Sequence, residues 1–164
     1  MDQHQDPVEW SRERWIDNDL PAPEQFTAMV ALLRTHQAMC ASIDTTLREF
    51  DLTRTGYLLM TTLQLSREGT RPLGQLSKHL MVHPTTVTLA LDRLEERKLL
   101  KRSPHPTDRR TILATLTPAG HRLLDKATNA LAEAGYGLDD LSATKATKVV
   151  DVLRDVRSKI DTSD

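Results

Sequence analysis

The sequence predicts a mainly α-helical fold: a winged helix-turn-helix with a small β-hairpin as its wing, flanked by N- and C-terminal dimerisation helices. Three observations predict it. Apolar residues recur at spacings of three and four along most of the chain, two short helical stretches meet at a tight turn before Pro84, and a proline-rich tip then separates two short strands. Only 4% of the 164 residues are aromatic, so we expect a core of aliphatic side chains that is completed by a partner.

Three helices are predicted in the N-terminal part of the chain. Residues 7–17 can form a short amphipathic helix with Trp15 as an aromatic anchor. Residues 24–50 then show an almost unbroken helical pattern, and a helix of this length usually braces against a partner. Thr53 is a good N-cap for a third helix over 54–67.

A helix-turn-helix is predicted next. Pro72 is expected to start a short helix over 73–80, and residues 81–83 form the turn. Pro84 stands where the first residue of the following helix, 84–98, is expected, because its missing N–H costs nothing there.

The wing and the C-terminal helices complete the prediction. Residues 99–102 and 109–116 form a hairpin around the tip 103–108, since alternate residues of the second strand are apolar. Thr117 caps a helix that runs to about residue 134, and Ser142 caps the last helix, 143–160.

Charge is distributed unevenly along the chain, although the net charge is −1. The window from Arg67 to Arg122 has eleven basic and five acidic residues, which is +6, so the rest of the chain is −7. An ordinary solvated surface is the simple explanation, but so sharp an asymmetry indicates a localised basic surface.

Several short motifs follow one another in a specific order: Leu52-Thr53, Leu76-Ser77, Thr86-Val87-Thr88, Leu91-Asp92-Arg93-Leu94, Asp108-Arg109-Arg110 and Leu116-Thr117-Pro118-Ala119-Gly120. Together they resemble the MarR family of bacterial winged-helix regulators, over about residues 24–160. One departure is Lys98, where many relatives have Gly. The resemblance implies a ligand-responsive homodimer, most often a cytoplasmic repressor, whose two lobes read a pseudo-palindromic double-stranded DNA operator.

On this interpretation the chain divides into three parts. Residues 1–23 form an N-terminal extension that contributes to dimerisation, 24–50 and 118–164 form the helical dimerisation region, and 51–117 form the winged helix-turn-helix DNA-binding domain.

The start of the helix after Pro84 is the predicted recognition surface. A major groove about 12 Å wide admits a helix but little bulk, which favours short hydrogen-bonding side chains. The predicted recognition-helix contacts are Pro84, Thr85, Thr86, Thr88, Leu89 and Arg93. The alternative is that the threonines only cap the helix and face solvent.

The wing supplies a second set of predicted contacts. Arg110 at the tip can enter the minor groove, where narrow A·T tracts concentrate negative potential. Asp108 would orient the Arg110 guanidinium, and Arg109 would bind phosphate. Further phosphate contacts are expected at Arg71, Gln75, Lys78 and Lys101, each of which can equally be ordinary surface.

Regulators of this resemblance bind effectors in a crevice between the dimer helices and the winged-helix lobe. The residues expected to line it are His36, Met39, Cys40, Tyr57 and Met60, which are at least as well explained as core residues. Cys40 has no cationic neighbour within one turn to lower its pKa, so an inert thiol is favoured over a redox sensor.

Other chemistry is not supported. His79 and His83 are four apart, but the turn at 81–83 separates them, so no metal site and no cofactor are expected. No phosphate-binding loop, nucleophile elbow or catalytic carboxylate pair is present, so no enzyme is expected. One cysteine and the lack of a long apolar run indicate the cytosol.

The alternative function is a protein-interaction module that acts through its helical dimer surface without DNA. Such a module has no need of the Asp108/Arg110 wing.

Overall fold

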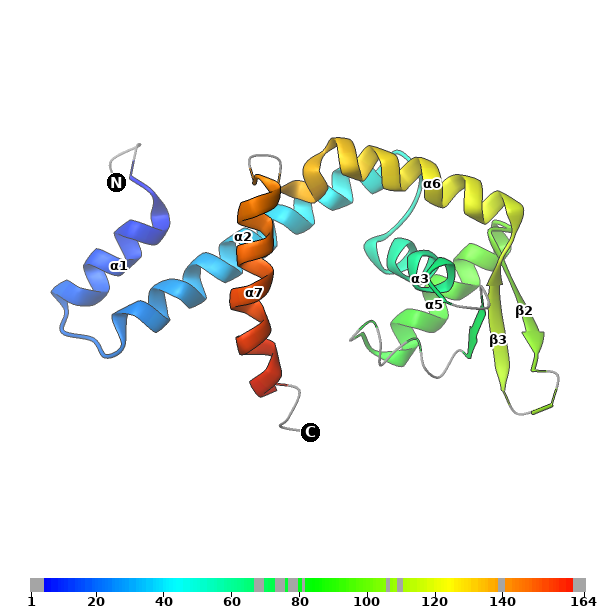
Figure 1. Cartoon of the computed structure of the whole chain (residues 1–164), viewed down its shortest axis with the longest axis horizontal. Helices are drawn as coiled ribbons and strands as arrows, with labels where there is room; N and C mark the ends of the chain where they lie inside the picture. Colours follow the sequence, from blue (N-terminus) through cyan, green and yellow to red (C-terminus); the bar gives the residue numbers. More distant parts are fainter. Residues whose placement is uncertain are drawn as a thin grey trace.

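A computed structural model describes residues 5–66, 70–72, 76, 80, 82–105, 107–108, 111–138 and 141–160. For residues 159 and 160 it describes the backbone alone. The elements in chain order are α1 (Pro7–Asp17), α2 (Pro23–Arg48), α3 (Arg54–Gln64), β1 (Thr70–Pro72), α5 (Pro84–Glu96), β2 (Leu100–Pro104), β3 (Ile112–Leu116), α6 (Pro118–Glu133), η1 (Gly135–Gly137) and α7 (Ala143–Ile160). The predicted mainly α winged-helix fold is confirmed. Figure 1 shows α1 and α2 as an arm at one end and a lobe of α3, α5 and the sheet at the other.

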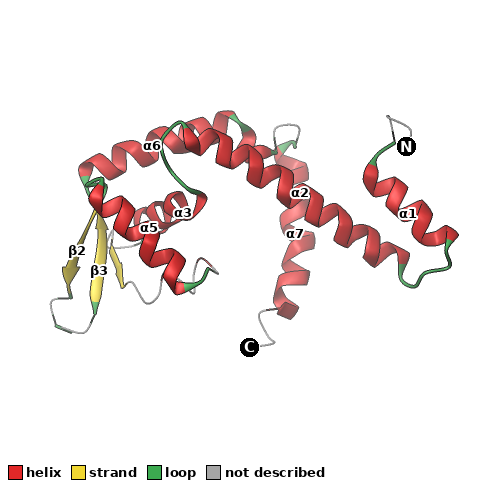
Figure 2. Ribbon diagram, turned by 180° about the vertical axis from the view of Figure 1, so that it is seen from behind, coloured by secondary structure: helices red, strands yellow, loops and turns green. Residues whose placement is uncertain are grey.

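A three-stranded antiparallel sheet of order β1-β3-β2 forms the wing side of the lobe, coloured yellow in Figure 2. The predicted hairpin is present, with Leu100 opposite Leu116 and Pro104 opposite Ile112. The third strand was not predicted. We expected Pro72 to start a helix over 73–80, but Pro72 ends β1, opposite Leu113. Leu76 and Leu80 are helical, and the other residues of 73–80 lie outside the described part of the chain. A strand of three residues is too short to show a pattern, and an edge position tolerates a proline.

Apolar side chains from the lobe make one core. The buried members are Leu47, Leu52, Tyr57, Leu59, Met60, Leu63, Leu76, Val87, Leu91, Leu94, Leu99, Leu100, Ala114, Leu116, Leu124, Ala127 and Leu131. The long helix α2 contributes only Leu47 to this set, and α1 and α7 contribute none. The core therefore holds the lobe together, whereas most of the arm is left exposed.

Local capping explains where several helices begin. The Thr53 side chain accepts a hydrogen bond from the Gly56 N–H at 3.0 Å, and Thr117 accepts one from the Gly120 N–H at 3.0 Å. Ser142 Oγ accepts one from the Lys145 N–H at 3.4 Å, so all three predicted caps are confirmed. The third helix ends at Gln64 and not at 67, and the Leu65 that follows is 78% exposed.

The helix from Pro84 ends at Glu96, two residues earlier than predicted, because Lys98 adopts a left-handed backbone with φ of 58°. Glycine is the residue that adopts this conformation without strain, which gives a physical reason for the family's preference at this turn.

Replacing Lys98 by glycine is therefore expected to stabilise the protein by about 0.5–1 kcal/mol, because the strain at φ of 58° is removed. Chemical denaturation measures this change. Lys98→Ala is the control, since it also removes the charge but keeps the strain. Equal stability of the Gly and Ala variants would contradict the explanation.

Candidate nucleic-acid interface

The first turn of α5 presents a small polar surface to solvent. His83 caps the helix, its Nδ1 accepting a hydrogen bond from the Thr85 N–H at 3.3 Å. All six predicted recognition contacts, Pro84, Thr85, Thr86, Thr88, Leu89 and Arg93, are exposed, and Val87 between them is buried. Within the described part of the chain, the Thr86 hydroxyl has no hydrogen-bond partner, so it is free to bond a ligand.

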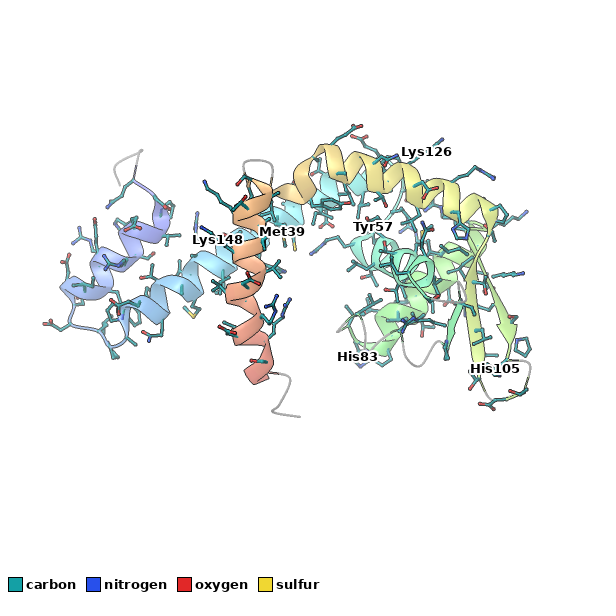
Figure 3. All side chains as sticks on the ribbon, viewed as in Figure 1. Met39, Tyr57, His83, His105, Lys126 and Lys148 are labelled. Atoms are coloured by element: carbon teal, nitrogen blue, oxygen red, sulfur yellow. The ribbon has the colours of Figure 1, made fainter. Side chains whose placement is uncertain are left out.

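The hairpin tip lies at the same edge of the lobe as the start of α5. Figure 3 shows the labelled His83 and His105 both at the lower edge. The Asp108 side chain accepts a hydrogen bond from the Thr111 hydroxyl at 2.6 Å, and the Thr111 N–H donates to the Asp108 carbonyl at 3.0 Å. These bonds hold one side of the tip. Arg109 and Arg110, and with them the predicted pairing of Asp108 to Arg110, lie outside the described residues.

An ion-pair cluster joins the wing to α5. Arg102 of β2 pairs with Asp92, and its Nε lies 3.1 Å from Glu95 Oε2. The Arg102 backbone N–H also donates to Glu95 Oε1 at 3.0 Å. The hairpin is thereby tied to the helix that starts at Pro84, which fixes the two exposed surfaces relative to each other.

A second cluster joins α5 to the junction between α2 and α3. Asp51, at this junction, has a left-handed backbone with φ of 50°. Its Oδ1 accepts from Arg93 Nη2 at 2.6 Å, and its Oδ2 lies 3.7 Å from Arg97 Nε. Arg97 also donates to the main-chain oxygens of Asp51 and Phe50, at 2.5 and 3.1 Å. The sequence did not reveal this cluster, because Asp51 and Arg93 are 42 residues apart and belong to no common pattern.

The predicted phosphate contacts are not alike in the structure. Lys101 on β2 is exposed. Arg71 lies half-buried in β1, opposite Ala114, and its Nε is buried without a hydrogen-bond partner among the described residues. Gln75 and Lys78 lie outside the described residues. Since Arg93, Arg97 and Arg102 are all ion-paired, less of the basic window's charge is free than the sequence count suggested.

The five predicted effector residues are not brought together as one lining. Tyr57 and Met60 are core residues of α3, whereas His36 on α2 is exposed and Met39 and Cys40 are half-buried. Figure 3 places Met39 on the arm and Tyr57 in the lobe. The Tyr57 hydroxyl lies 3.2 Å from Thr128 Oγ1, which links α3 to α6.

A tyrosine that the sequence reasoning did not single out lies near Tyr57. Tyr136 in η1 has a left-handed backbone with φ of 55°. Partial burial, with Tyr57 beside it, raises the pKa of the Tyr136 hydroxyl. The end of the preceding helix near residue 134 was predicted, but which tertiary neighbour Tyr136 meets is not visible in a local pattern.

Cys40 has a charged neighbour from another helix. Arg54 Nη1 on α3 lies 2.5 Å from Cys40 Sγ, and His36 Nε2 lies 3.4 Å from it. Arg54 is held by Asp44, whose Oδ1 accepts from Nε at 2.7 Å. Arg54 belongs to another helix, 14 residues along the chain, so no local pattern around Cys40 predicts this contact.

An open pocket of about 690 Å³ lies where α2, α3 and α5 meet. It is lined by Asp44, Arg48, Asp51, Leu52, Thr53, Arg54, Thr55, Leu58, Val82 and Arg93. None of the five predicted effector residues lines it. The pocket is of a size that binds small molecules, and Arg93 of α5 forms part of its wall.

The model of the MarR family matches residues 52–112 of the chain. The described part of this range includes α3, β1, α5 and β2. YhbI of Bacillus subtilis, an uncharacterized HTH-type transcriptional regulator, is 36% identical over 96 residues. The match covers 58% of this chain and 61% of YhbI, so the chain spans about three fifths of the length of this relative.

Solved structures are similar over more of the chain. Sco5413, a MarR family transcriptional regulator from Streptomyces coelicolor, is 28% identical with a TM-score of 0.76, and covers 86% of this chain and 98% of its own. BpsR from Bordetella bronchiseptica, whose DNA binding is regulated by 6-hydroxynicotinic acid, is 27% identical with a TM-score of 0.68. The BpsR match covers 77% of this chain and 90% of BpsR. Both structural matches extend beyond residues 52–112 of this chain.

Proposed function

This chain belongs to the MarR family of winged-helix proteins, and we propose that it is a sequence-specific double-stranded DNA-binding transcriptional regulator, acting as a repressor. The observation that supports this most is the exposed, threonine-rich first turn of α5 at the same edge of the lobe as the hairpin tip. Threonine hydroxyls can bond base edges in the major groove while a wing tip reaches the adjacent minor groove. Asp108, Arg109 and Arg110 remain the proposed wing contacts.

We further propose that the regulator is a homodimer. The described part of α7 makes no extensive contact with another element, and in Figures 1 and 2 it stands apart from the lobe. Large apolar side chains are nevertheless exposed on the arm and on α7: Trp10, Ile16, Leu20, Met29, Leu32, Leu33, Val149, Val150, Val152 and Val156. Apolar area of this extent rarely stays in water, so a second copy is the occupant that we propose. Residues 1–23, 24–50 and 118–164 would then form the dimer region and 51–117 the DNA-binding domain.

Release by a small-molecule effector is the third part of the proposal. It is supported by BpsR, whose DNA binding a small molecule regulates. His36, Met39, Cys40, Tyr57 and Met60 stay the proposed lining, in a crevice that the second copy would complete.

No catalytic activity is proposed, because the family and the relatives are transcriptional regulators. Among the described helices, none combines the length and hydropathy of a membrane span.

Selection of bound duplexes from random DNA tests the function directly. We expect an enriched pseudo-palindrome, and an affinity that falls linearly with salt on logarithmic axes. Thr86→Ala should weaken binding to the selected duplex by about 1–3 kcal/mol at one position per half-site, because it removes a base-reading hydroxyl. Thr144→Ala, at an exposed threonine on α7, is the matched control and should bind normally.

Two results would argue against this function. If no sequence is enriched and duplex DNA is not retained at low salt, the protein-interaction module becomes the better explanation. If Thr86→Ala leaves the selected sequence and its affinity unchanged, the start of α5 does not read bases.

A further inference from the structure

Arg93 lies on the same exposed face of α5 as some of the predicted recognition residues, but its guanidinium is held by an ion pair. Thr85, Leu89 and Arg93 are spaced four apart on α5, so they lie along one face of the helix. Thr85 and Leu89 are exposed, and Leu89 is 64% exposed. The Arg93 guanidinium, however, lies 2.6 Å from Asp51 Oδ1, at the junction of α2 and α3. The first basic side chain after Leu89 on this face, Arg93, is therefore already paired with a carboxylate of the same chain.

Two features make this pair able to open. Its side chains are 56% and 63% exposed, and exposed ion pairs are weakly held because water and salt screen them. Both residues also line the 690 Å³ pocket, which leaves the guanidinium free volume in which to move. A DNA phosphate is therefore able to compete with Asp51 for Arg93.

Arg97 depends less than Arg93 on the Asp51 carboxylate, although its Nε lies 3.7 Å from Asp51 Oδ2. Its side chain is only 28% exposed, and two of its hydrogen bonds go to the main-chain oxygens of Phe50 and Asp51. Replacing the Asp51 carboxylate by an amide would leave these bonds in place. Asparagine also tolerates the left-handed backbone of this position, so the junction between α2 and α3 would be retained.

We propose that Asp51 is a specificity-determining residue that competes with DNA phosphate for Arg93, and so weakens binding to duplexes of the wrong sequence. The inference rests on the proposed DNA-binding function. On an unselected duplex, the pair stays closed and one potential phosphate contact per protomer is withheld. On the selected duplex, the first turn of α5 contacts the bases and holds the helix close to the DNA. A phosphate can then replace the Asp51 carboxylate as the partner of Arg93.

The test compares Asp51→Asn with the wild type on an unselected duplex and on the selected one, over a range of salt concentrations. With Arg93 released, the slope of log affinity against log salt on the unselected duplex should steepen by about 0.9 per protomer, the value of one added phosphate contact. Affinity for the unselected duplex should rise by about three- to fivefold at low salt, while affinity for the selected duplex changes less. Discrimination between the two duplexes therefore falls.

Matched variants separate this from a general effect of charge. Glu96→Gln removes one negative charge from an exposed acidic residue on α5 that has no ion pair among the described residues, and it should leave the slope unchanged. In an Arg93→Gln background, adding Asp51→Asn should change nothing further, since the cation is gone. The inference is overturned if the Asp51→Asn slope equals that of the wild type, if Glu96→Gln steepens it equally, or if the effect persists in the Arg93→Gln background. A wild type that binds no duplex at all would instead overturn the proposed function.

Discussion

Replacing Gly120 by alanine is expected to lower the free energy of unfolding by more than about 3 kcal/mol, or to prevent folding altogether. A Cβ at Gly120 would lie 2.0 Å from the main-chain oxygen of Leu99, a contact that no rotamer change can relieve. The helix cannot simply move away, because the same oxygen accepts a hydrogen bond from the Thr117 N–H at 3.0 Å. Chemical denaturation, or the yield of soluble protein, measures the effect.

Gly56→Ala is the matched control for this prediction. A Cβ there would lie 3.3 Å from the Thr53 hydroxyl and 4.0 Å from Leu94, so only a small shift of a side chain is needed. Alanine also favours the helix by about 1 kcal/mol over glycine, which offsets the crowding. We expect a change of less than about 1 kcal/mol for Gly56→Ala. A Gly120→Ala variant as stable as Gly56→Ala would show that α6 does not pack on Leu99 as described.

Placing two charges on the apolar face of α7 is expected to dissociate the proposed homodimer. Val149 and Val156 are exposed in the single chain and lie two helical turns apart on one face. Asp at both positions would bury two carboxylates in the interface, and an unpaired buried charge is strongly unfavourable. Sedimentation should show the double variant as a monomer or as unfolded protein, and its affinity for the selected duplex should fall by at least about 100-fold, because two half-sites are no longer bound together.

Thr144→Asp/Thr147→Asp adds the same two charges at exposed polar positions of α7 and serves as the control. This variant should remain dimeric and bind DNA with the affinity expected from its extra negative charge alone. A Val149→Asp/Val156→Asp protein that still sediments as a dimer would place the interface elsewhere.

Local sequence patterns predicted most of the helical framework. Periodicity located α1, α2, α5, α6 and α7 to within two residues of their ends, and Thr53 and Thr117 were identified as caps from residue type and position. These signals are reliable because they come from backbone hydrogen bonds and from side chains within a turn of each other. β1 was missed for the opposite reason, since its stability comes from pairing with β3, more than forty residues away in the register Thr70 to Thr115.

The sequence by itself determined most of the helices, the β2–β3 hairpin, the caps, and the threonines at the start of α5. Only the tertiary structure decided which partners the charged and polar side chains meet: Arg93 with Asp51, Arg102 with Asp92, and Arg54 with Cys40. A periodic pattern states which face of a helix is apolar, but not which element covers it, and ion pairs form between side chains that no local spacing relates. Tyr57 and Met60 illustrate the limit, because the same apolar spacing is typical of a ligand-binding wall and of the core in which the structure places them.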